Sequence, residues 1–87
     1  MPTSNVVSMG IRRAGSLFVT TNDKMLYQEL DQARNHKGPV QIIPTDSFVF
    51  LCMSKFDMQS DSQMMFVLVE NSIGWMFWHD VDFEHVA

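Results

Sequence analysis

The chain contains too little cysteine and glycine for several kinds of site. With one cysteine in 87 residues, Cys52, it cannot form an intramolecular disulfide, which excludes a disulfide-stapled secreted mini-protein. A zinc finger or an iron–sulfur site is excluded for want of ligands. Only four glycines are present and none forms a Gly-rich phosphate loop. Cys52 lies in an apolar run, where we expect a buried, inert thiol.

Long apolar runs are also missing. No run exceeds six residues, as in 48–53, whereas a membrane-spanning helix needs roughly 20. The first 15 residues contain no apolar stretch preceded by basic residues, so the sequence predicts no signal peptide. We therefore expect a soluble, intracellular (by default cytoplasmic) protein without a membrane partner.

Positive charge is absent from the last third of the chain. Residues 56–87 contain six acids and no Lys or Arg, a net charge of −6, while residues 1–55 have a net charge of +2 from six bases and four acids. The C-terminal part should repel phosphate backbones. A nucleic acid would have to bind near the basic residues of the N-terminal part: Arg12, Arg13, Lys24, Arg34 and Lys37.

Apolar side chains are plentiful by contrast. Hydrophobic residues make up 46% of the chain, and eight methionines accompany seven Phe, two Trp and one Tyr. This composition is too apolar for intrinsic disorder, and 87 residues suit one domain. We expect a flexible N-terminus over 1–10 and a single small domain over 11–87. Its apolar residues must lie in a core, be shared with another chain, or form a binding surface.

One short helix is predicted near 23–36. Leu26, Leu30 and Ala33 follow helical spacing, Asn22 suits the N-cap, and Gly38 suits the position after the C-terminus. The alternative is a long, partly irregular loop containing a helical turn.

Most of the remaining chain has the pattern of strands. A β-prone run over Gly15–Thr21 precedes the helix, and a 3₁₀ turn is expected over His79–Asp82. The segment Asn71–Gly74 suits a hairpin connection. Five strand-like segments follow the helix: Pro39–Ile43, Ser47–Phe56, Gln63–Glu70, Trp75–Trp78 and Phe83–Ala87. The fold class is therefore mainly β, a small five-stranded closed barrel with one short helix.

Two of these strands are apolar on both faces. Phe48 and Phe50 alternate with Val49 and Leu51, and the segment 64–69 has the same character. In a monomeric barrel one face of each strand should be polar. The helix can cover part of the outer face, and the remainder indicates a partner or self-association.

The stretches PVQIIPTDSFVFL and MMFVLVENSIGWMFWHDVDFEHV resemble an SH3-like small barrel over about residues 40–87. In that family an apolar strand leads through a hairpin to a Gly-aromatic strand, as in Gly74-Trp75, and a 3₁₀ turn and a short final strand follow. The chain departs from peptide-binding SH3 domains at Met64, Phe77 and Asp80, where their ligand-binding aromatic and proline residues would stand, so polyproline binding is not implied.

The predicted helix followed by strands is also similar to the architecture of the Sm/Lsm RNA-binding proteins, whose helix precedes the first barrel strand. Their Arg-Gly signature after an apolar strand is absent here.

The sequence predicts a non-catalytic interaction module that binds protein and forms a homo-oligomer. The residues expected to bind a partner are Trp75, Phe77, Trp78, Met64 and Met65. The alternative is an Sm-like RNA-binding oligomer that uses Arg12, Arg13, Lys24, Arg34 and Lys37. No enzyme activity, catalytic residue, metal site or cofactor is expected, and the cluster from His79 to His85 is interpreted as a solvated acidic edge.

Overall fold

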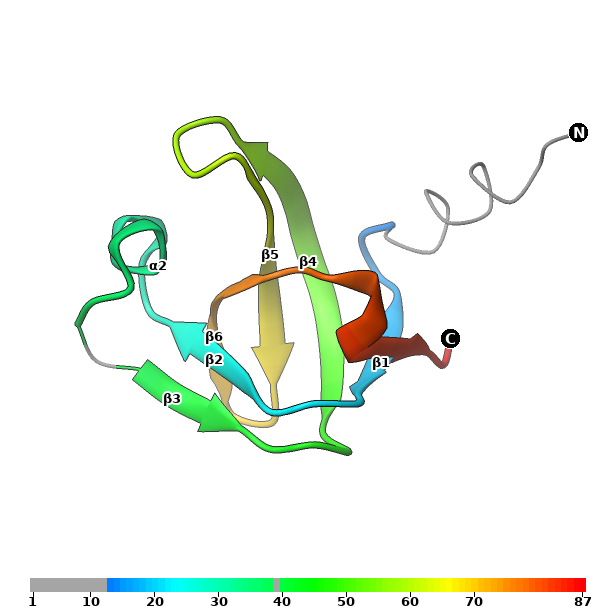
Figure 1. Cartoon of the computed structure of the whole chain (residues 1–87). Coiled ribbons are helices and arrows are strands. Elements are labelled where there is room, and N and C mark those ends of the chain that lie inside the picture. Colours follow the sequence, from blue (N-terminus) through cyan, green and yellow to red (C-terminus); the bar gives the residue numbers. More distant parts are fainter. Residues whose placement is uncertain (1–12, 39) are drawn as a thin grey trace, which may run out of the picture.

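The computed structural model describes residues 13–38 and 40–87, and within these residues it has seven strands, one α-helix and one 3₁₀ turn. The elements in chain order are β1 (Leu17–Thr20), β2 (Lys24–Tyr27), α2 (Leu30–Asn35), β3 (Val40–Ile43), β4 (Phe48–Asp57), β5 (Ser62–Val69), β6 (Ser72–Phe77), η1 (Asp80–Asp82) and β7 (Phe83–His85) (Figure 1).

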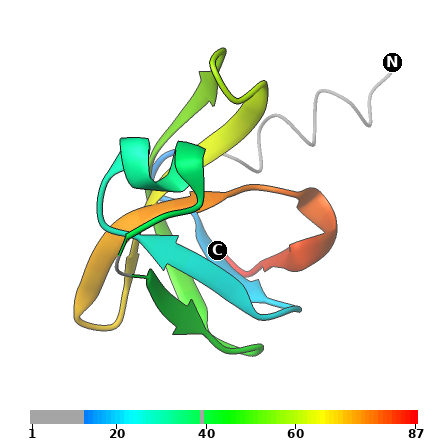
Figure 2. The same cartoon turned by 60° about the vertical axis from the view of Figure 1, so that its left-hand side comes forward.

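All seven strands form one antiparallel sheet in the order β3-β2-β6-β5-β4-β1-β7. The sheet curls into a half-barrel around its inner face (Figures 1 and 2). The long strands β4 and β5 lie at its centre, and β3 and β7 lie at its two ends. The predicted mainly β fold, compatible with a small barrel, is thus confirmed. The sheet is an open half-barrel with β3 and β7 at its ends, not the predicted closed barrel.

The predicted number of five strands is wrong, because two further segments pair into the sheet. The run Gly15–Thr21 supplies β1, which lies between β4 and β7. The first part of the predicted helix is β2, which forms four residue pairs with β3 and meets β6 at Tyr27 and Trp75. Pairing with two other strands therefore outweighs the helical spacing of Leu26, Leu30 and Ala33.

The helix is only six residues long. Glu29 rather than Asn22 is its N-cap, and Gln32 completes a capping box by accepting a hydrogen bond from the Glu29 backbone N–H at 3.1 Å. Its C-cap, His36, is left-handed with a φ of 52°. Asn22 instead donates a hydrogen bond to Asp82. The element between β2 and β3 is thus a loop with one short helix, close to the predicted alternative.

Gly74 lies within a strand, not in the predicted hairpin connection. The β5–β6 turn consists of Glu70 and Asn71, because Val69 pairs directly with Ser72. A Cβ atom on Gly74 would lie 2.5 Å from the carbonyl oxygen of Tyr27. Glycine is therefore needed at this position because the backbone of β2 crosses β6 there.

The hydrophobic core fills the inner face of the half-barrel. Val49, Leu51, Met65, Val67 and Met76 each have 0% of their surface exposed. Trp78 follows the end of β6 and stacks on Phe83 with ring centroids 3.7 Å apart. The predicted 3₁₀ turn before β7 is confirmed as η1.

The expected flexible N-terminus, 1–10, and Arg12 lie outside the described residues. Within the described part, no helix has the length and apolar character needed to cross a bilayer.

Candidate functional site

The outer face of the central sheet is the candidate site. Along β4, β5 and β6, alternate side chains point to this face and the others to the core side, because neighbouring residues of a strand alternate between faces. The cross-strand pairs Phe50–Leu68, Leu68–Ile73 and Phe66–Trp75 place these residues on one surface. The two ends of the outer face differ in how far their side chains are buried.

The end beside the β4–β5 hairpin tip is covered by the chain's own helix. Tyr27, Ala33 and Met64 form a buried cluster there, with exposures of 3%, 0% and 0%. Leu30, Trp75 and Phe77 pack around it. His36 stacks on Phe77 with ring centroids 5.1 Å apart. We call this region the covered end.

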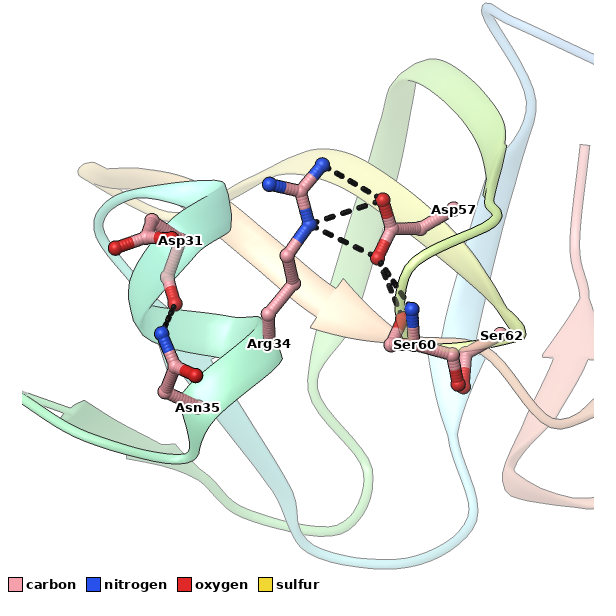
Figure 3. Close-up of polar contacts among 6 residues, drawn as sticks. All are labelled: Asp31, Arg34, Asn35, Asp57, Ser60 and Ser62. Carbon is pink, nitrogen blue, oxygen red and sulfur yellow. Dashed lines mark hydrogen bonds and ion pairs between the residues drawn. The ribbon is translucent and has the colours of Figure 1, made fainter.

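A polar clamp ties the helix to the hairpin tip (Figure 3). Arg34 of α2 donates hydrogen bonds to both carboxylate oxygens of Asp57, from Nε at 3.0 Å and from Nη2 at 2.7 Å. Ser60 donates two more to Oδ2 of Asp57, from its backbone N–H at 3.1 Å and from its hydroxyl at 2.6 Å. The Arg34 guanidinium, followed by the Ser60 hydroxyl, holds the pKa of Asp57 well below its usual range. The clamp fixes α2 over the covered end.

The other end of the outer face has no cover among the described residues. Phe48 is 60% exposed, Ile73 53%, Met53 45%, Leu68 41% and Phe50 40%. We call this surface the open face. It comprises these five residues together with the partly buried Leu17, Val19, Phe66 and Trp75.

The open face is continuous and uncharged. Ladder pairing sets Leu17 beside Phe50, Phe50 beside Leu68 and Leu68 beside Ile73, which makes one apolar row across four strands. A second row joins Met53 to Phe66 and Phe66 to Trp75, whose rings lie 5.0 Å apart. The five most exposed side chains present roughly 400–500 Å², if a large apolar side chain has a surface of about 150–250 Å². A patch of this size on a monomer commonly marks a binding surface.

Charges of opposite sign lie at the two ends of the open face, and Glu84 of β7 lies beside Val19 at its side edge. Lys55 is the next residue after Met53 on the outer side of β4. Arg13 lies near the same part of β4, because the Gly15 N–H donates to the Leu51 carbonyl and the Ser16 N–H donates to the Arg13 carbonyl. We call these two residues the basic end. Asp46 precedes Phe48, and Glu70 follows β5 in the turn; we call these two the acidic end. All four side chains are exposed.

The structure redistributes the aromatic and methionine residues predicted to bind a partner. Met64, Met65 and Trp78 are buried in the chain itself, with exposures of 0%, 0% and 5%, so a partner of the folded chain cannot reach them. Trp75 and Phe77 are half-buried beside the helix. The residues predicted to bind a partner did not include Phe48, Phe50, Leu68 and Ile73. The two-faced apolar pattern of β4 and β5 was the signal for the first three, whereas Ile73 lies in the segment predicted as a hairpin connection.

The basic residues of the RNA-binding alternative are dispersed. Lys24 forms an ion pair with Asp82 at 2.8 Å, and Arg34 is held by Asp57. Arg13 and Lys37 are exposed. Two of the four described cations thus already have carboxylate partners, which reduces the positive potential available to a phosphate backbone.

The acidic segment from His79 to His85 has structural contacts. Asp82 binds Asn22 and Lys24, and the indole N–H of Trp78 donates to Asp80 at 3.0 Å. The Lys24 ammonium lowers the pKa of Asp82 through its hydrogen bond. Among residues 13–38 and 40–87, no group of three or more His, Cys, Asp or Glu side chains could hold a metal ion. Cys52 lies at a β-bulge and is partly exposed rather than fully buried as expected.

Two pockets flank β2, and both are small. One, of about 300 Å³, lies where β2 and β3 diverge from the start of β6 and includes Leu26 and Ile73. The other, of about 210 Å³, lies between β2 and the His36–Phe77 stack. In the second pocket, the Lys24 ammonium is paired with Asp82 and the Tyr27 hydroxyl donates to the Met25 sulfur, so the open face is the stronger candidate.

Comparison of the chain with protein-family models, curated proteins and solved structures gave no match. The geometry of the outer face is therefore the basis for proposing a function.

Proposed function

We propose that this protein is a non-catalytic interaction module of the SH3-like barrel type, which binds protein and self-associates through the open face. The observation that carries this proposal is the pair of uncharged apolar rows around Phe50 and Phe66, left in contact with water. Burying such a surface against another chain removes apolar area from water, which is the main driving force of protein association.

The order of the C-terminal elements supports the SH3-like assignment. An apolar strand, β5, leads through the two-residue turn to β6, which contains Gly74 and Trp75. The 3₁₀ turn η1 and the short strand β7 follow. The helix α2 lies after β1 and β2, whereas the helix of an Sm-like barrel precedes its first strand. The order of the elements within residues 13–38 and 40–87 thus favours the SH3-like over the Sm-like assignment.

The composition of the open face suits a protein partner better than a nucleic acid. Phe, Trp and Met are enriched at the centre of protein interfaces, and charged residues are depleted there. Aromatic side chains that stack on single-stranded bases need basic neighbours. Here the described rows contain no charge, and Lys24 and Arg34 are engaged elsewhere.

The molar mass in solution tests this proposal. We expect sedimentation equilibrium or light scattering at tens of micromolar to detect an oligomer. Phe50→Gln and Leu68→Gln should shift it to monomer while the circular dichroism spectrum stays native. Met58→Gln is the matched control, because Met58 is 84% exposed at the hairpin tip, away from the open face.

A monomeric wild type at these concentrations would contradict self-association. An oligomer that survives both open-face substitutions would show that the site is wrong. Salt-dependent binding of single-stranded RNA that survives the same substitutions would favour the RNA-binding alternative instead.

A further inference from the structure

We propose that the partner at the open face is a second copy of this chain, packed face to face with its strands antiparallel to those of the first copy in a closed two-fold dimer. This inference rests on the proposed function and adds the relative orientation of the two copies and the closure of the assembly at two chains. Three features of the described residues lead to it: the size of the open face, the position of α2 and the charges at the two ends.

The size of the open face suits one copy of a small sheet. A stable interface of standard size buries about 800 Å² on each partner, with an apolar centre and a polar rim. The exposed apolar side chains supply roughly half of that area, and the polar residues around them can supply the rim. Two sheets that pack face to face keep their strand directions within about 30° of a common line. The open face, built from β1, β4, β5 and β6, is a surface of that kind.

The helix decides between the two possible orientations. Because α2 covers Met64 at one end of the outer face, it forms a step beside the open face (Figure 2). A two-fold axis along the strands would bring the two helices to the same end, where they would hold the sheets apart. A two-fold axis across the strands places each helix beyond the β5–β6 turn of the other copy. Only the second arrangement lets the apolar rows meet.

The charges favour the same orientation independently. The basic end, with Arg13 and Lys55, lies toward α2, and the acidic end, with Asp46 and Glu70, lies at the opposite limit of the open face. In the antiparallel arrangement, Lys55 of each copy approaches the acidic end of the other. In the parallel arrangement, like charges would meet at both ends, which disfavours association. A symmetric interface uses the same patch twice, so the contact closes at two chains.

Chemical crosslinking tests the orientation directly. In a Cys52→Ser background, chains carrying Lys55→Cys and chains carrying Glu70→Cys are treated with a short bismaleimide, alone and as a mixture. We expect a crosslinked dimer in the mixture and little crosslinking in either variant alone. Efficient crosslinking of each variant with itself, and a lower yield in the mixture, would show parallel packing and would overturn the proposal.

The second test exchanges the charges at positions 55 and 70 and measures the dissociation constant of the dimer. Lys55→Glu should raise the dissociation constant of the dimer about tenfold at low salt, since it sets like charges together in two symmetric places. Adding Glu70→Lys to the same chain should restore the dissociation constant to within about threefold of wild type. Failure of the rescue would contradict the antiparallel pairing.

The outcomes separate this inference from the proposed function. If Phe50→Gln abolishes a wild-type dimer but the mixed crosslink is absent, the orientation is wrong and the interaction surface stands. If the chain forms open-ended polymers, the closed two-fold arrangement is wrong. If it stays monomeric throughout, both the inference and the proposed self-association fail.

Discussion

The covered end and the open face belong to the same strands but differ in what shields them. At the covered end, Met64 lies beneath α2 and is fully buried. Two residues further along the same side of β5, Phe66 is partly exposed, and Leu68 is 41% exposed. The apolar alternation does not change between them. Burial of this face is therefore decided by another element, not by the strand sequence.

The lengths of α2 and β4 explain why the helix covers only one end of the outer face. Six helical residues span about 9 Å, whereas the ten residues of β4 extend over roughly 33 Å. The Arg34–Asp57 clamp also holds the helix at the hairpin tip, away from the β5–β6 turn. The described part of the chain thus shields one end of its outer face and leaves the other end uncovered.

The largest expected contrast comes from truncating one side chain at each end. Met64→Ala should destabilise the fold by about 2–4 kcal/mol, because it leaves a cavity under α2. Leu68→Ala should cost less than about 1 kcal/mol, measured where the chain is monomeric. Urea unfolding at low protein concentration gives both values. Equal costs would mean that the two ends are shielded alike.

The next largest loss of stability is expected from a substitution where β2 crosses β6. Gly74→Ala would bring a methyl group within 2.5 Å of the Tyr27 carbonyl oxygen and push β2 away from the sheet. We expect a loss of about 1–3 kcal/mol. The matched control is Ser72→Ala, at a partly exposed position on the same strand. Thermal unfolding of both variants tests this, and a Gly74→Ala variant as stable as wild type would contradict the close approach.

The clamp should make the cover sensitive to acid. Arg34 lowers the pKa of Asp57 in the folded chain. The ionised Asp57 carboxylate therefore contributes its full stabilisation at pH values above the ordinary carboxyl pKa of about 4, and this contribution declines as the pH falls below that value. Asp57→Asn lacks this contribution. The stability difference between wild type and Asp57→Asn should therefore shrink as the pH falls from 6 to 3.

Urea unfolding at several pH values measures this difference. A gap between wild type and Asp57→Asn that is constant or grows toward low pH would show that the clamp does not depend on the Asp57 charge. The effect is expected to be the smallest of the three, since Arg34 retains some contact with water.

The strands of the half-barrel were predictable where local pattern and tertiary pairing agree. The two-faced runs of β4 and β5, the 3₁₀ turn and β7 all follow from the sequence. The segment Lys24–Tyr27 was not predictable from spacing alone, because Leu26 enters the main core while Ala33 enters the cluster under α2. One apparent helical stripe thus serves two different clusters.

The sequence was sufficient to predict that an apolar surface needs a cover, but not which residues form that surface. The surplus of apolar side chains on two-faced strands indicates that something must cover them. Which of them stay exposed depends on where α2 lies, and that depends on the pairing of β2 with β6 and on the contact of Arg34 with Asp57, 23 residues away. Met64 and Leu68 share one strand and one face, so sequence reasoning could not separate them.

The methionines allow the most direct test of the difference between the two ends. With methyl-labelled methionine, a dilution series by NMR reports at once on Met53 in the open face, on the buried Met64 and on the exposed Met58. We expect the Met53 methyl signal to shift or broaden as the concentration rises, while those of Met64 and Met58 stay unchanged. A Met53 signal that is independent of concentration through tens of micromolar would contradict the central claim that the open face joins two chains.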